Sequence, residues 1–248
     1  MWILRKEVIA SLFFYLLLAF VTLRAVDTEQ AVHAQNPLIF ALIIPAAVLM
    51  GVIMQRNQWY LALVPVVLAA LLPDVIEALF IPFLLIAISL YVYSGRSAKE
   101  LAADTGLREN PGARKAVFGS LLWFLILMAS IALSALILMA FGINDRAAVL
   151  EKVQSFSIPL IITGVTIAPV AEELFFRGVL LNKAGIIPSS LLFAVAHVSY
   201  GSIGEIVSAF IAGVVLCKAR QSEKTLVIPI IVHIMINAIS MSVMFYYG

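Results

Sequence analysis

Hydrophobic residues gather in nine long stretches along this chain, and short polar segments connect them. The stretches cover residues 7–24, 37–54, 59–72, 75–93, 116–141, 157–181, 186–199, 203–217 and 226–246. Apolar runs of about 20 residues are typical of helices that cross a lipid bilayer. The runs 59–72 and 75–93 are separated only by Pro73 and Asp74, so they are either two spans or one broken span. The pattern predicts an all-α, polytopic transmembrane helical bundle with eight to nine spans.

The composition supports a membrane location. Hydrophobic residues make up 63% of the 248 residues and charged residues 12%, whereas soluble domains are about 45–50% apolar and about 25% charged. No soluble fold of this length could bury so much apolar surface. The net charge of +2 gives no basic surface for nucleic acid. We therefore expect an integral multi-pass membrane protein whose solvent is lipid, with its oligomeric state left open.

The distribution of positive charges predicts the orientation of the spans. With a cytoplasmic N-terminus and nine crossings, only Arg24, Arg146 and Lys152 fall on the outer side, and Arg177 lies within a span. The remaining twelve of the sixteen Lys and Arg residues fall on the cytoplasmic side. Positive residues are enriched in cytoplasmic loops. This bias favours nine spans, with the N-terminus inside and the C-terminus outside.

This topology divides the chain into three regions. Residues 1–94 form N-terminal transmembrane helices of unassigned role. Residues 95–115 form a cytoplasmic loop, in which Ser97 is placed to cap a short interfacial helix over residues 98–103. Residues 116–248 form the remaining spans, which contain the candidate site residues.

Three ionisable residues stand close together inside the span 157–181. Charged side chains at such depth are unfavourable by ~2.5–3.5 kcal/mol and usually mark a function. Glu173 and Arg177 are four residues apart, so they share a helix face and can pair. Glu172 points about 100° away from that face. Unless another span supplies a cation, it should hold a proton more tightly and suit the role of a general base.

Two later spans carry His197 and the pair His233 and Asn237, which lie on one helix face at a spacing of four residues. Counted from the cytoplasmic end of each span, Glu172 and His197 lie ~14 and ~16 Å deep, and His233 and Asn237 lie ~10 and ~16 Å deep. Helices running in alternating directions thus bring their polar groups to one layer. We expect these groups to form a single site that opens towards the cytoplasm.

The motifs in these spans resemble those of a known family. Glu-Glu-x-x-x-Arg at 172–177, Phe-x-x-x-His at 193–197 and His-x-x-x-Asn at 233–237 are similar, in order and spacing, to the motifs of the CPBP family of CAAX proteases and bacteriocin-processing enzymes, also called Abi. The resemblance covers about residues 157–246, with a weaker similarity at 105–108. The resemblance marks 116–248 as a CPBP-like catalytic transmembrane core.

The resemblance implies a glutamate-dependent intramembrane endopeptidase that acts on a membrane-associated peptide or protein tail. By position, Glu172 would activate the attacking water and His197 would assist it. His233 and Asn237 would stabilise the oxyanion. The remaining two residues, Glu173 and Arg177, would shape and neutralise the site. No cofactor is implied.

Three alternatives remain at this point. Two Glu and two His could bind zinc with a position open for water, although the chain has no His-Glu-x-x-His helix. The chain could be a non-enzymatic membrane scaffold or immunity protein on the same fold. It could also be a proton-coupled transporter with Glu172 and His197 as a relay, but the internal repeats that many transporters show are not visible.

We predict that the C-terminus lies on the outer side of the membrane. A reporter fused after Gly248 should be active outside, because nine crossings that start in the cytoplasm end there. The measurement compares a reporter that is active only outside with one that is active only in the cytoplasm. A cytoplasmic signal from the C-terminal fusion contradicts the nine-span topology.

Overall fold

The computed structural model describes residues 73–247, and this part of the chain is helical and contains no strand. The whole chain divides into two compact units, residues 1–95 and 96–248. The described helix of the first unit is α4 (Pro73–Val92), which agrees with the predicted segment 75–93. The predicted spans 7–24, 37–54 and 59–72 lie outside the described residues.

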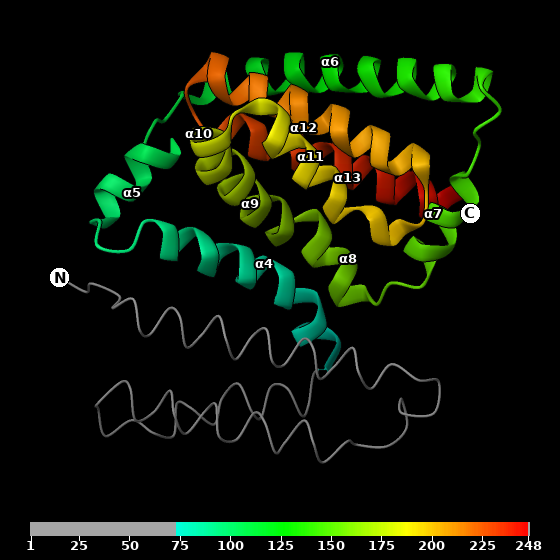
Figure 1. Cartoon of the computed structure of the whole chain (residues 1–248), viewed down its shortest axis with the longest axis horizontal. Coiled ribbons are helices and arrows are strands. Elements are labelled where there is room, and N and C mark those ends of the chain that lie inside the picture. The colour runs from blue at the N-terminus through cyan, green and yellow to red at the C-terminus, as the bar shows by residue number, and fades with distance from the viewer. Residues whose placement is uncertain (1–72, 248) are drawn as a thin grey trace. The chain divides into compact units, whose positions relative to one another are not determined.

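The second unit consists of helices of very different lengths (Figure 1). They are α5 (Ala98–Thr105), α6 (Ala113–Ala140), α7 (Arg146–Gln154), α8 (Ile158–Val165), α9 (Ile167–Glu173), the π-helix η2 (Leu174–Leu180), α10 (Leu181–Ala184), α11 (Ile186–Ala196), the 3₁₀ turn η3 (Val198–Tyr200), α12 (Ile203–Glu223) and α13 (Val227–Tyr247).

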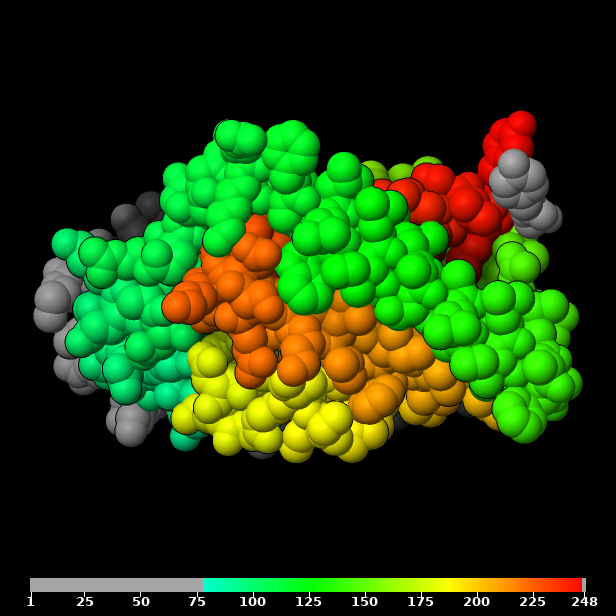
Figure 2. Space-filling model, turned by 90° about the horizontal axis from the view of Figure 1, so that it is seen from above, coloured from blue at the N-terminus to red at the C-terminus, as the bar shows by residue number. Residues whose placement is uncertain are grey.

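The helix α12 lies at the centre of this unit, between α6 on one side and α11 on the other (Figure 2). The helix α13 packs against both α6 and α12. Most of α6 is apolar and exposed, and its buried residues are only Ser120, Leu127 and Ser134. An apolar helix that buries so little surface against protein requires lipid on its outer face.

Two described helices, α6 and α13, are long and apolar enough to cross a membrane, and the bent pair α7 and α8 gives a third if it is one span broken by 117°. The predicted span 157–181 is divided among α8, α9, η2 and the start of α10. The predicted span 186–199 is also shortened, because α11 ends at Ala196. Eleven helical residues extend only ~16 Å, about half of the hydrocarbon core. The count of eight to nine spans is therefore not confirmed and stays a prediction.

The short helix in the loop 95–115 is confirmed as α5. Ser97 accepts a hydrogen bond from the Glu100 backbone N–H, and the Glu100 carboxylate accepts one from the Ser97 backbone N–H. These two bonds form a capping box. The hydrogen bonds from Ser97 also hold the pKa of Glu100 below its ordinary value. The helix ends at Gly106, whose φ of +82° suits a glycine.

The end of α5 is tied to the connection between α12 and α13. The Arg220 Nε–H donates to the Thr105 carbonyl at 3.3 Å, and the Leu226 N–H donates to the Gly106 carbonyl at 3.0 Å. A Cβ on Gly106 would lie 2.4 Å from the Arg220 guanidinium, so a larger residue there would displace this side chain in addition to straining the backbone at φ of +82°. The loop 95–115 therefore packs on the end of the bundle.

The opposite end of the bundle is held by Asp145, which follows α6. Its Oδ1 accepts from the Ser202 hydroxyl at 2.9 Å, and its Oδ2 accepts from the Ile203 N–H at the start of α12. Burial raises the pKa of the Asp145 carboxyl, but these bonds and one from the Gly204 N–H together lower it below its ordinary value. Asp145 thus caps α12 from a distant part of the chain.

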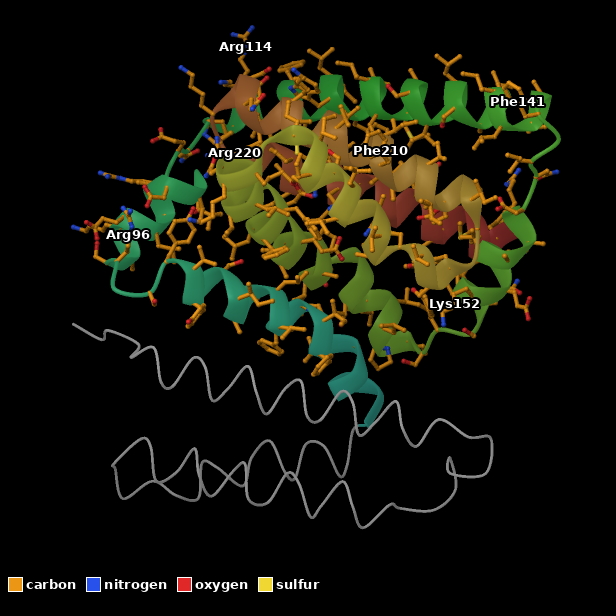
Figure 3. All side chains as sticks on the ribbon, in the orientation of Figure 1. Arg96, Arg114, Phe141, Lys152, Phe210 and Arg220 are labelled. Carbon is orange, nitrogen blue, oxygen red and sulfur yellow. The ribbon has the colours of Figure 1, made fainter. Side chains whose placement is uncertain are left out.

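Residues that the sequence assigns to opposite sides of the membrane lie at opposite ends of the second unit. Arg114 and Arg220, predicted to be cytoplasmic, lie at one end, and Lys152, predicted to be outside, lies at the other (Figure 3). The sidedness of these ends stays a prediction.

We predict that Asp145→Ala lowers stability by about 1 kcal/mol, the usual effect of removing a helix N-cap. The carboxylate contribution is present above the ordinary pKa of aspartate and is lost as the pH falls through the lowered value. Thermal unfolding of the purified protein in detergent measures both effects, with the exposed Glu151→Gln as the control. Equal melting temperatures for wild type and Asp145→Ala would show that the cap contributes nothing.

Candidate active site

The first motif lies on an interrupted helix. After Glu173 the helix widens into η2, where the Leu181 N–H bonds to the Phe176 carbonyl five residues earlier. The Ser189 hydroxyl, on α11, donates to the same carbonyl at 2.8 Å. Such π-helical segments frequently occur at functional sites. Here the segment begins directly after the two glutamates and contains Arg177.

Glu173 and Arg177 form a fully buried ion pair. The Arg177 Nη1 lies 2.6 Å from the Glu173 Oε1, and both side chains are 0% exposed. The guanidinium carbon also lies 4.4 Å from the centre of the Phe193 ring, which gives a cation–π contact. The predicted pairing of these two residues on one helix face is observed. If either partner were removed, the other charge would remain buried without compensation, which is strongly destabilising.

His233 joins the two glutamates from another helix. Its Nδ1 lies 2.8 Å from the Glu173 Oε1, the same oxygen that Arg177 binds. Because an ionised carboxylate only accepts, the Nδ1 carries the hydrogen. The His233 Nε2 lies 3.7 Å from the Glu172 Oε2. Glu172 has no partner on its own helix, as the helical period predicts, but α13 supplies His233.

The two glutamates differ in exposure. The Glu172 side chain is 21% exposed, whereas Glu173 is completely buried. Water can therefore reach Glu172 and cannot reach Glu173. Glu172 is therefore accessible to a reactant, whereas Glu173 can only bind neighbouring side chains.

His197 lies at the end of α11, and Phe193 connects it to the other groups. The His197 Nδ1 lies 2.9 Å from the Phe193 carbonyl, which can only accept, so this nitrogen carries the hydrogen. The Phe193 ring is 4.8 Å from the His197 ring and 5.6 Å from the His233 ring. One phenylalanine thus packs between the two histidines.

Asn237 lies one helical turn beyond His233. Its Nδ2 donates to the Gly164 carbonyl at 2.8 Å, which ties α13 to the end of α8. An amide nitrogen carries two hydrogens, so one remains for another acceptor. The structure therefore gives Asn237 a packing role and leaves it able to donate again.

Sequence reasoning missed one residue that contacts His197. Tyr200 stacks on the imidazole, with ring centres 5.9 Å apart and planes 14° from parallel. The spacing of three residues between His197 and Tyr200 is visible in the sequence, but it brings the two rings together only if the chain forms a 3₁₀ turn there.

Some buried atoms of the ion pair lack hydrogen-bond partners. Within the described part of the chain, Glu173 Oε2 and Arg177 Nε and Nη2 are buried and make no hydrogen bond. Residues 73–247 also contain no group of three or more His, Cys, Asp or Glu side chains that could hold a metal ion. We therefore derive no step through a metal, and the zinc alternative stays a hypothesis that chelation tests.

Comparison with known proteins adds to this geometry. Residues 154–239 match the model of a family described as type II CAAX prenyl endopeptidase Rce1-like. This segment belongs to the CPBP family. All three motifs and all six predicted site residues lie within the matched segment of this CPBP domain, so the resemblance is confirmed there. The family match and the apolar helices together support the prediction of an integral membrane protein.

One curated relative is an uncharacterised 24.3 kDa protein of Escherichia coli, 34% identical over 91 residues. The similarity covers 31% of this chain and 42% of that relative, so the chain spans less than half of the relative's length. No solved structure matches.

We predict that Arg177→Met strongly destabilises the CPBP domain, by about 3–5 kcal/mol, because it leaves the Glu173 charge buried without its main partner. The additional change Glu173→Gln should recover part of this loss. Unfolding in detergent measures both variants, with the exposed Lys183→Met as the control. A double variant no more stable than Arg177→Met would show that the two charges are not coupled.

Proposed function

We propose that this chain is an intramembrane endopeptidase in which Glu172 activates water. The proposal rests on the different exposure and bonding of two adjacent carboxylates. Glu173 is buried and held by Arg177 and His233, whereas Glu172 is partly exposed beside the same histidine. A general base needs an accessible carboxylate, and fixed neighbours define its geometry.

The reaction begins with a water molecule beside Glu172. The carboxylate takes a proton from this water while the water oxygen bonds to the scissile carbonyl carbon, and the carbonyl oxygen becomes an oxyanion. Glu172 then gives the proton to the leaving amide nitrogen as the C–N bond breaks. His197 supports the first step, because a neutral ring with hydrogen on Nδ1 has a lone pair on Nε2 that can accept the second hydrogen of the water.

The oxyanion needs donors in a low-dielectric site. Asn237 can supply its second amide hydrogen. His233 can donate from Nε2 only when both ring nitrogens carry hydrogen, because its Nδ1–H is already bonded to Glu173. The buried pair of Glu173 and Arg177 holds His233 in place for this role.

The proposed substrate is a membrane-associated peptide or protein tail that reaches the site from the cytoplasmic side. The description of the matched family names prenyl endopeptidases. A prenylated tail and an unmodified one both fit the mechanism, because the chemistry occurs at the peptide bond. The proposed mechanism needs no metal.

We predict that Glu172→Gln lowers cleavage at least about 100-fold, the usual contribution of a general base, without loss of the folded protein. The experiment compares the termini of membrane proteins in cells that carry wild type, Glu172→Gln or the exposed Glu109→Gln at equal levels. A processed terminus should be present with wild type and Glu109→Gln and absent with Glu172→Gln.

Three outcomes would contradict this assignment. If the processed terminus persists with Glu172→Gln, Glu172 is not the base. If the cells' phenotype is unaffected by Glu172→Gln, a scaffold or immunity protein is favoured. Loss of cleavage by purified protein after exhaustive chelation, with recovery on adding zinc, would support the metal alternative.

A further inference from the structure

The turn after α11 places an aromatic ring on His197. The chain leaves α11 through η3, where the Tyr200 N–H donates to the His197 carbonyl at 3.1 Å. Side chains three residues apart eclipse each other in a 3₁₀ turn. The rings of His197 and Tyr200 are accordingly stacked, and Gly201, with φ of +68°, ends the turn directly afterwards.

The imidazole also contacts a second aromatic residue. Phe193 contacts the His197 ring and accepts its Nδ1–H through the backbone carbonyl. Phe156 meets the Tyr200 ring edge-on, with centres 6.2 Å apart. The His197 ring thus contacts two aromatic side chains, and one of them packs against a third.

We infer that Tyr200 is a positioning residue for His197. Tyr200 fixes the plane of the imidazole so that Nδ1 stays bonded to the Phe193 carbonyl and Nε2 remains the acceptor. The catalytic meaning of this assignment rests on the proposed function, but the state of the His197 ring can be measured without a substrate.

Nitrogen NMR of the full chain, labelled with ¹⁵N-histidine, tests the role of Tyr200. The chain has three histidines, so a His197→Gln variant assigns the signals. In wild type and in Tyr200→Phe, which keeps the ring, His197 should show hydrogen on Nδ1 and a bare Nε2 when neutral. Tyr200→Leu should give averaged signals from both tautomers, whereas Tyr91→Leu, which removes an exposed ring elsewhere, should not.

Cleavage gives the second readout. Misplacement of the ring in Tyr200→Leu should lower kcat about 10- to 100-fold with little change in KM, while Tyr200→Phe keeps most of the activity. Unchanged His197 signals in Tyr200→Leu would overturn the role of Tyr200. Altered signals in a chain that cleaves nothing would support the positioning geometry and reject the proposed function.

Discussion

A buried ion pair determines how the site is assembled. The charges of Glu173 and Arg177 have no access to water, so each must find its partners within the protein. His233 from α13 binds the same Glu173 oxygen as Arg177, and the Arg177 guanidinium contacts the face of the Phe193 ring from α11. Three parts of the chain that are distant in sequence therefore meet around one charge pair. Glu172 is the carboxylate that remains accessible beside them.

The irregular helices bring polar groups from several parts of the chain to one site. A long regular helix would satisfy its own backbone but could not bring several polar side chains to one point. In the π-helix the Phe176 carbonyl accepts from both the Leu181 N–H and the Ser189 hydroxyl, and the 3₁₀ turn puts Tyr200 over His197. Irregular backbone at membrane depth is tolerated where protein surrounds it or where it lines a cavity. The irregular segments are thus part of the site.

Local patterns predicted the features that depend on neighbours in sequence. The pairing of Glu173 with Arg177 follows from their spacing of four residues, and the cap of α5 follows from Ser97. The sequence could not show that His233 bridges both glutamates, because that contact depends on how α13 packs. The length of α11 was overestimated because apolar composition continues through the turn that ends it.

The central claim is that Glu172 acts on water and forms no bond to the substrate. The most direct test is a single turnover in H₂¹⁸O, with the product and the enzyme peptide that contains Glu172 both analysed by mass spectrometry. The mechanism predicts one ¹⁸O atom in the new carboxyl terminus of the product and none in the Glu172 side chain. An ¹⁸O atom in the Glu172 carboxylate would reveal a covalent acyl intermediate and would contradict the mechanism.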